Sequence, residues 1–155
     1  MDKKRILVVD DERDVRLLVH RMLEKDYIVL EAANGEEAIE AARTQQPDLI
    51  LMDLIMPKTD GYTACSEIKA DQATKGIPVV IVTAVGHEFN KKFALEVGAS
   101  GYVTKPFSTQ GLMEVISRLL VRACESHNIV PQSPQTSLSQ DNPGQQSSVS
   151  QVREP

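Results

Sequence analysis

Residues 49–62 read LILMDLIMPKTDGY, and this stretch shows how the chain is built. The apolar run at 49–52 ends directly at Asp53, which indicates a short buried strand followed by an acidic residue. Pro57 and Gly61 fit a turn that leads into a helix over residues 61–69. A strand, a loop and a helix in close succession predict one β-α unit.

The same unit recurs along the chain about every 20 to 25 residues up to residue 123. Strands are predicted at residues 6–9, 28–32, 49–52, 79–82 and 102–104. Most of these runs are continuous rather than alternating, which is typical of parallel strands covered on both faces. A capping pair at Asn34 and Glu37, a candidate cap at Ser108 and apolar residues at helical spacing predict the intervening helices. Five strands alternating with five helices predict an α/β fold with a doubly wound parallel sheet.

The composition limits the classes of function. The chain has 155 residues, 41% of them hydrophobic and 25% charged, with a net charge of −5 and a pI near 5.2. No basic excess is available to bind nucleic acid or an anionic membrane, so we expect protein partners. No apolar run reaches the length of a signal-peptide core or a membrane span. Cys65 and Cys124 lack metal-ligand spacing, and a reducing cytoplasm is expected.

The character of the chain changes near residue 125. Residues 126–155 are dominated by Ser, Gln, Pro and Asn and contain few sizeable apolar side chains. Such a segment cannot bury a core. We therefore expect one folded domain over residues 1–124 and a low-complexity, disordered tail without a catalytic role over 125–155.

Polar side chains close the predicted inner strands. Asp10 and Asp11 follow the first strand and Asp53 follows the third, so a doubly wound sheet would gather three carboxylates at one edge. Carboxylate oxygens with waters suit Mg²⁺, which would offset their mutual repulsion. Thr83 and Lys105 close the fourth and fifth strands, where a hydroxyl and an ammonium group could contact a carboxylate or a phosphoryl group.

Four motifs at compatible spacing resemble the response-regulator receiver family. They are VVDDE at 8–12, LILMDLIMPKTDGY at 49–62, VIVTA at 80–84 and GASGYVTKPF at 98–107, and the resemblance covers residues 5 to about 122. It implies the flavodoxin-like (βα)5 fold, also called CheY-like, with strand order 2-1-3-4-5. Residues 1–124 would then be a receiver domain.

The resemblance also implies roles at the sheet edge. Asp53 would accept the phosphoryl group, and Lys105 and Thr83 would contact it. The ion, Mg²⁺ with Mn²⁺ as an alternative, would be held by Asp10, Asp11, Asp53 and the backbone carbonyl of Ile55.

Further positions carry over as switch or structural residues. Thr83 and Tyr102 would be the coupled switch, in which Tyr102 moves from an exposed to a buried position. Pro106 matches the family's cis peptide, and an X-Pro bond adopts the cis form at a much lower free-energy cost than other peptide bonds. Pro57 and Gly61 would shape the loop after Asp53.

By the same resemblance the chain would be a response regulator of a two-component signal transduction system. A sensor histidine kinase or a histidine phosphotransfer protein would supply the phosphoryl group, and the chain would take part in its own phosphotransfer and dephosphorylation without being an enzyme for an external substrate. Output would pass through a downstream protein at the face of the fourth helix, fifth strand and fifth helix, where Phe89, Lys92, Phe93 and Tyr102 are candidates. The chain would be a monomer or a phosphorylation-dependent dimer, without direct binding to nucleic acid or membrane.

Two apolar positions bear on the lifetime of the phosphoryl group. Ile55, two residues after Asp53, and Val85, two residues after Thr83, would border the path of an attacking water. Neither side chain can orient a water, which leads to the hypothesis that spontaneous dephosphorylation is slow.

Three alternatives place different functions on these residues. A phosphatase of the haloacid-dehalogenase type would need an aspartate at position 12, where Glu12 stands, and a cap segment. A flavodoxin-like module that binds a nucleotide or flavin would need a phosphate-cradling loop after the first strand, where the acids would instead repel an anion. A receiver-like scaffold without chemistry would have no need for the full set of acids, Thr83 and Lys105.

Overall fold

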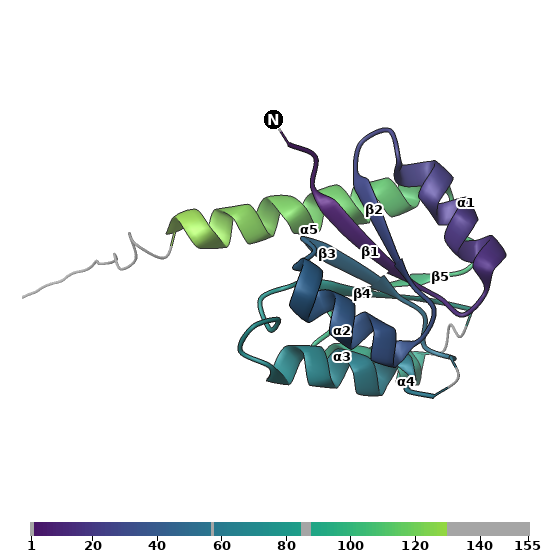
Figure 1. Cartoon of the computed structure of the whole chain (residues 1–155). Helices are drawn as coiled ribbons and strands as arrows, with labels where there is room; N and C mark the ends of the chain where they lie inside the picture. The colour runs from purple at the N-terminus through teal and green to yellow at the C-terminus, as the bar shows by residue number, and fades with distance from the viewer. Residues whose placement is uncertain (1, 57, 85–87, 130–155) are drawn as a thin grey trace, which may run out of the picture. The chain divides into compact units, whose positions relative to one another are not determined.

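The computed structural model describes the backbone of residues 2–56, 58–84 and 88–129, and the side chains of all these except 88–91 and 124–129. Strands and helices alternate along it (Figure 1). The elements are β1 (Arg5–Val9), α1 (Arg13–Leu23), β2 (Ile28–Ala32), α2 (Gly35–Gln45), β3 (Leu49–Met52), α3 (Gly61–Ala70), β4 (Val79–Thr83), α4 (Glu88–Glu96), β5 (Gly101–Thr104) and α5 (Thr109–Ile129). They form one five-stranded parallel sheet in the order β2-β1-β3-β4-β5, which confirms the predicted fold and strand order.

Successive residues of the strands supply two separate cores. On β1, Leu7 and Val9 pack with α2, α3 and α4, whereas Ile6 and Val8 pack with α1 and α5. This alternation follows from the two-residue period of a strand, and Figure 1 shows helices on both faces of the sheet. The continuous apolar runs of β1, β3 and β4 are therefore buried on both faces.

The two edge strands depart from this pattern. Most residues of β2 and β5 are partly or fully exposed, and Ile28 at the start of β2 is one of the exposed large apolar residues. An edge strand has a neighbour on one side only, so the helices shield it less completely than a central strand.

The predicted helix caps are present. The side chain of Asn34 accepts a hydrogen bond from the backbone N–H of Glu37 at 2.9 Å, and the carboxylate of Glu37 accepts one from Ala33 N–H at 2.8 Å. Ser108 Oγ accepts from Gly111 N–H at 2.9 Å at the start of α5. After α4, Gly98 has a positive φ of 105°, a conformation that glycine commonly adopts at the end of a helix.

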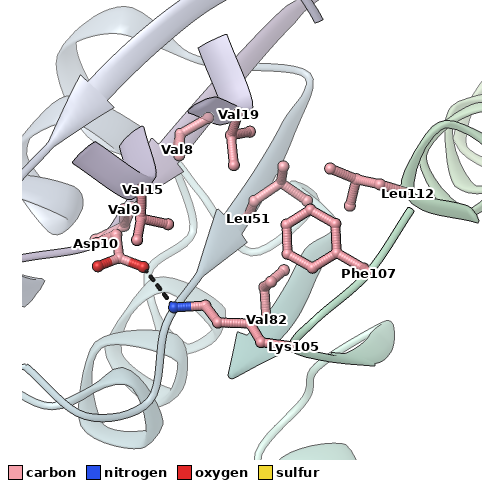
Figure 2. Close-up of a pocket in the computed structure, with 10 residues that line it drawn as sticks. All are labelled: Val8, Val9, Asp10, Val15, Val19, Leu51, Val82, Lys105, Phe107 and Leu112. Carbon is pink, nitrogen blue, oxygen red and sulfur yellow. Dashed lines mark hydrogen bonds and ion pairs between the residues drawn. The ribbon is translucent and has the colours of Figure 1, made fainter. Parts of the chain in front are cut away.

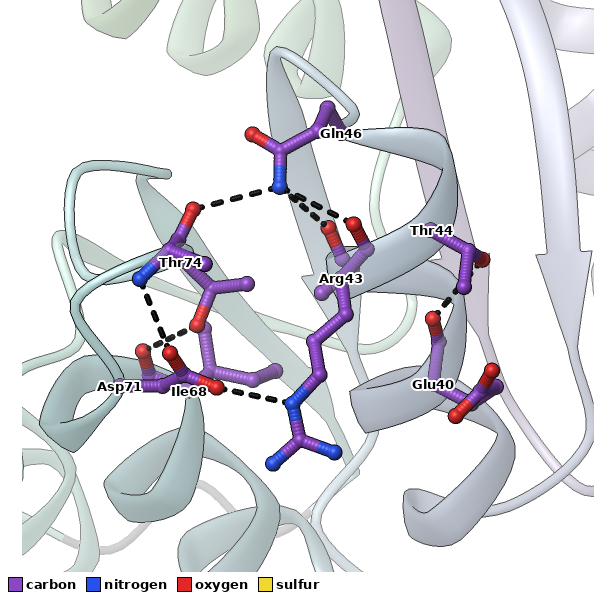
Figure 3. Close-up of polar contacts among 9 residues, drawn as sticks. Glu40, Arg43, Thr44, Gln46, Ile68, Asp71 and Thr74 are labelled. Carbon is purple, nitrogen blue, oxygen red and sulfur yellow. Dashed lines mark hydrogen bonds and ion pairs between the residues drawn. The ribbon is translucent and has the colours of Figure 1, made fainter.

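Polar contacts tie the end of α2 to the loop between α3 and β4 (Figure 3). Gln46 donates from its amide nitrogen to the carbonyls of Ala42, Arg43 and Ala73, each at 3.2 Å. Arg43 pairs with Asp71 at 2.8 Å, and buried Thr74 donates to the Ile68 carbonyl at 2.6 Å. These contacts fix the loop that precedes β4. This loop lies at the amino ends of the strands, opposite to the carboxyl ends that carry the acids.

The C-terminal part begins inside α5. The chain divides into a compact unit over Met1–Leu120 and a second unit over Val121–Pro155. The second unit is helical as far as Ile129, so α5 continues past residue 124, and residues 130–155 of the predicted tail lie outside the described residues. None of the helices in the described part of the chain is long and apolar enough to cross a membrane.

Candidate functional site

The carboxyl ends of the strands bring the predicted polar residues together. Asp10 follows β1, Asp53 follows β3, and Thr83 is the last residue of β4. Backbone hydrogen bonds lock neighbouring strand ends: Asp53 N–H donates to the Val9 carbonyl at 3.0 Å, and Lys105 N–H donates to the Thr83 carbonyl at 2.8 Å. One sheet edge therefore carries all four side chains on a rigid frame.

Three carboxylates form the acidic part of the site. Asp10, Asp11 and Asp53 each offer an oxygen, and these oxygens all lie within 4.8 Å of one another. Asp10 is only 3% exposed and Asp53 only 8%, whereas Asp11 is exposed. Two of the three acids are therefore held away from water, where a neutralising partner matters most.

Lys105 is that partner within the described chain. Its ammonium lies 2.9 Å from Asp10 Oδ2 and 3.8 Å from Asp53 Oδ2. Figure 2 shows this ion pair at one side of a pocket whose other lining residues are apolar. The lining residues are Val8, Val9, Asp10, Val15, Val19, Leu51, Val82, Lys105, Phe107 and Leu112. An apolar surrounding strengthens the charge interaction of Lys105 with Asp10, while Asp53 lies at the longer distance.

Opposing influences act on the Asp53 carboxyl. Burial raises the pKa of Asp53, and the charge of Asp10 adds to the rise, while Lys105, a hydrogen bond with Thr83 and the backbone N–H of Leu54 act in the other direction. The Leu54 N–H donates to Asp53 Oδ1 at 2.8 Å. The net pKa lies above the ordinary value for an aspartate. Asp53 therefore takes up a proton more readily than an ordinary aspartate, even though the Thr83 side chain and the Leu54 N–H contact its carboxylate.

The surroundings disfavour the charged form of Asp53, but they favour the charged form of Lys105. Burial by itself would lower the pKa of Lys105, but the hydrogen bond to Asp10 and the charges of Asp53, Asp10 and Glu12 outweigh it, and the net pKa is raised. Lys105 therefore stays an ammonium group at neutral pH.

The acidic cluster fits a hard divalent cation. Three carboxylates that can each turn an oxygen toward a common point are the oxygen donors that Mg²⁺ prefers, with waters completing its shell. Asp10, Asp11 and Asp53 would be the side-chain ligands, as predicted. The backbone carbonyl of Ile55 as a further ligand stays a prediction.

The loop after Asp53 is packed too closely for a side chain at Gly61. A Cβ there would overlap the backbone carbonyl oxygen of Asp53 and lie 2.8 Å from the α-carbon of Leu54. The Gly61 N–H donates to the Leu54 carbonyl at 2.9 Å, and Asp60 caps α3 by accepting from Thr63 N–H at 2.8 Å. Gly61 therefore lets α3 start directly against the backbone that carries Asp53.

Other predicted residues lie outside the cluster of Asp10, Asp11, Asp53 and Lys105. The Lys105–Pro106 peptide bond is cis, as the resemblance implied. Tyr102 is half-buried and packs against the core under α2, α3 and α4, and its movement in a switch stays a prediction. The side chain of Ile55 is 67% exposed beside the site.

Three predicted positions fall outside the part of the chain that the structure describes. Pro57 and Val85 do so entirely, and Phe89 does so with its side chain. Of the candidate interaction residues on α4, Lys92 and Phe93 are exposed, and the ring of Phe93 lies 4.7 Å from that of Tyr62 between centroids.

Two groups near the acids were not anticipated from the sequence. Arg16 Nη1 donates to the backbone carbonyl of Asp10 at 2.6 Å, and Leu54 supplies the N–H that contacts Asp53. Each contact has a main-chain atom on one side, the carbonyl of Asp10 or the N–H of Leu54, so no residue type or spacing in the sequence could have marked it.

Comparison with known proteins gives the family. The family model described as response regulator receiver domain matches residues 6–117. The chemotaxis protein CheY of Halobacterium salinarum is 42% identical over 118 residues, which are 76% of this chain and 97% of that protein. The alkaline phosphatase synthesis transcriptional regulatory protein PhoP of Bacillus subtilis is 40% identical over 121 residues, 77% of this chain and 50% of that protein. The chain thus spans about half the length of several curated relatives that it matches.

Solved structures agree with these relatives. The receiver domain of a sensor histidine kinase from Pseudomonas aeruginosa, solved with a magnesium ion coordinated in its active-site cleft, has a TM-score of 0.72 and 30% identity. The match covers 77% of this chain and 99% of that one.

Proposed function

This chain belongs to the response regulator receiver domain family, and we propose that it accepts a phosphoryl group on Asp53 from a phosphohistidine of a partner protein. The observation that carries the proposal is the arrangement around Asp53. A nearly buried carboxylate lies beside two further acids, a charged lysine and a threonine at the end of the sheet. The donor would be a sensor histidine kinase or a histidine phosphotransfer protein, and we place the reaction in the cytoplasm.

In the transfer, a carboxylate oxygen of Asp53 would attack the phosphorus in line with the histidine nitrogen. An O–P bond forms, the N–P bond breaks, and its electron pair returns to the imidazole. Lys105, already 3.8 Å from Asp53, would shift its ammonium toward the phosphoryl oxygens, and the Thr83 hydroxyl is in hydrogen-bond contact with the same carboxylate. Both groups would stabilise charge where it develops.

Asp10 and Asp11 would hold Mg²⁺ together with Asp53 and the Ile55 carbonyl, with Mn²⁺ as an alternative ion. The ion would supply positive charge to the phosphoryl oxygens when it is bound. Asp10 is already oriented, because its Oδ1 accepts a hydrogen bond from Glu12 N–H at 2.9 Å.

The new phosphoryl group adds about one to two negative charges at Asp53. We propose that Thr83 and Tyr102 respond to it and alter the face formed by α4, β5 and α5, where a downstream protein would bind. The exposed Lys92 and Phe93 on α4 support this choice of face. The chain would signal through protein contact, as a monomer or as a dimer formed on phosphorylation, and would be no enzyme for an external substrate.

The proposal can be tested with a small phosphodonor. The chain is incubated with acetyl phosphate with and without Mg²⁺, and its intact mass is measured. We expect one added phosphoryl group only when Mg²⁺ is present, and a rate lower by about a hundredfold in Lys105→Met, because Lys105 is the cation that would follow the phosphoryl oxygens. An adduct that forms equally well in Lys105→Met or without Mg²⁺ would contradict the proposed roles.

The lifetime of the phosphoryl group gives a second prediction. Ile55 presents an exposed apolar side chain beside Asp53 and cannot orient an attacking water, so we expect the phosphorylated chain to persist for many minutes in buffer. Ile55→Asn places a hydrogen-bonding group there and should shorten the half-life about tenfold. The decay is followed by intact mass after the donor is removed. A wild-type half-life of seconds, or no change in the variant, would reject this hypothesis.

A further inference from the structure

Arg16 on α1 bridges the end of β1 and the neighbouring strand β2. Its Nη1 donates to the backbone carbonyl of Asp10 at 2.6 Å, and its Nε donates to Glu31 Oε1 at 3.1 Å. The side chain is only 16% exposed. A guanidinium group has several N–H donors in one rigid plane, so it can satisfy a carbonyl and a carboxylate at the same time.

The carbonyl that Arg16 contacts belongs to the turn that carries two of the acids. Within this turn Asp10 Oδ1 accepts from Glu12 N–H at 2.9 Å, and Arg16 N–H donates to the Glu12 carbonyl at 3.1 Å. The other oxygen of Asp10 faces Lys105. Rotation of the peptide after Asp10 would move both Asp10 and Asp11, and the Arg16 contact opposes that rotation.

Glu31 holds Arg16 from the other side. It lies on β2, where it is paired with Val8 of β1, so its backbone is held to the strand that directly precedes Asp10. Its second oxygen, Oε2, lies 3.2 Å from His20 Nδ1 on α1. Both carboxylate oxygens of Glu31 are therefore engaged, and the guanidinium of Arg16 is fixed relative to β1.

We propose that Arg16, oriented by Glu31, is a positioning residue that sets the geometry of Asp10 and Asp11 for binding Mg²⁺. The proposal rests on the proposed function, since that function assigns these acids to the ion. Arg16 does not contact the reacting atoms. It acts through the backbone of a ligand residue, in the way that groups behind metal ligands commonly tune affinity by about 10-fold to 100-fold.

The sign of the effect separates positioning from simple charge. Arg16 is a cation close to a cation site, so by charge alone its removal would strengthen Mg²⁺ binding. If Arg16 sets the ligand geometry, its removal weakens binding instead. Arg13, an exposed arginine in the first turn of the same helix, provides a matched control for the loss of one positive charge.

The test measures Mg²⁺ affinity of the full, unphosphorylated chain by titration calorimetry. We expect Arg16→Met to bind Mg²⁺ about tenfold more weakly. Arg16→Lys keeps the charge but not the planar donor set, and should lose affinity to an intermediate extent. Glu31→Gln should show a smaller loss in the same direction. Arg13→Met should bind Mg²⁺ as tightly as the wild type or more tightly.

A second readout distinguishes positioning from damage to the fold. Phosphorylation by acetyl phosphate in Arg16→Lys should need more Mg²⁺ for its half-maximal rate, yet reach close to the wild-type rate at saturating Mg²⁺. If Arg16→Met does not fold, Arg16→Lys decides the question, because it keeps the positive charge and any loss of Mg²⁺ affinity then reports on geometry. Unchanged or tighter Mg²⁺ binding in the folded Arg16 variants overturns the inference and leaves the proposed function standing. Failure of the wild type itself to bind Mg²⁺ or to accept a phosphoryl group overturns the proposed function.

Discussion

At the scale of single residues, Asp53 is an acid in a site that disfavours its charged form. Burial raises its pKa, and Lys105, Thr83 and the Leu54 N–H compensate only in part. A buried acid with a raised pKa among directed donors is a candidate functional group, and the donors that contact the Asp53 carboxylate can also contact a group bonded to it. The position of Asp53 after an apolar strand was predictable from sequence. The hydrogen bond that it accepts from Leu54 was not, because any residue except proline at position 54 would supply that N–H.

The raised pKa of Asp53 predicts a pH-dependent gain in stability on its removal. Below the pKa of the unfolded chain the carboxyl is protonated in both states and costs nothing. As pH rises through the window between the ordinary and the raised pKa, ionisation increasingly disfavours the folded state. Asp53→Asn should therefore raise the free energy of unfolding by about 1 kcal/mol at pH 7 in Mg²⁺-free buffer, and the gain should vanish toward about pH 3.

Urea unfolding at several pH values measures this effect. Asp71→Asn is a control of opposite sign, because the hydrogen bond from Arg43 lowers the pKa of Asp71 and its ionised form favours the folded state. Asp71→Asn should thus be neutral or destabilising at pH 7. A chain that becomes less stable at pH 7 on Asp53→Asn would contradict the electrostatic description of the site.

At the scale of elements, the site depends on how closely α3 begins against β3. The sequence predicted a turn and a helix start at Gly61, since glycine after a loop is a familiar signal. It could not show that a side chain there would meet the Asp53 carbonyl, because that contact arises only when the strand and the helix are packed. The same limit applies to Arg16, whose role depends on where α1 lies relative to β1 and β2.

Gly61→Ala should harm both stability and chemistry. The added Cβ overlaps the backbone of Asp53 and Leu54, so the loop must shift, at a cost of about 1 to 3 kcal/mol. Because the shift moves Asp53 itself, phosphorylation by acetyl phosphate should also slow. Gly76→Ala is the matched control, since nothing lies within 4 Å of a Cβ at that position. Equal behaviour of the two variants in urea unfolding and in intact-mass kinetics would show that the close approach at Gly61 is unimportant.

At the scale of the whole domain, the carboxyl ends and the amino ends of the strands differ in function. The carboxyl ends of the strands hold the acids and Lys105, while the contacts of Arg43, Gln46 and Thr74 fix the loop before β4. The strand order was implied by the resemblance to the receiver family, and the parallel sheet followed from the repeated β-α pattern. The extension of α5 to Ile129 did not, because the composition changes earlier than the helix ends.

This division predicts a variant that loses stability without losing chemistry. Thr74 is 1% exposed and donates to the Ile68 carbonyl, so Thr74→Val leaves a buried carbonyl without that donor and should cost about 1 to 3 kcal/mol. Thr44→Val, at an exposed position where the hydroxyl donates to Glu40, should change stability by less than about 0.5 kcal/mol. Both variants should be phosphorylated at the wild-type rate below their unfolding transitions. Slower phosphorylation of folded Thr74→Val would show that the two ends of the strands are coupled.

The most direct test of the central claim is to locate the phosphoryl group on the chain. The protein is phosphorylated with acetyl phosphate and Mg²⁺, the acyl phosphate is reduced with borohydride, and peptides are sequenced by mass spectrometry. A phosphorylated aspartate is converted to homoserine, and we predict this conversion at Asp53 alone, with no conversion at any residue in Asp53→Asn. Conversion at Asp10 or Asp11 in the wild-type chain, or an adduct that persists in Asp53→Asn, would contradict the assignment of Asp53 as the phosphoryl acceptor.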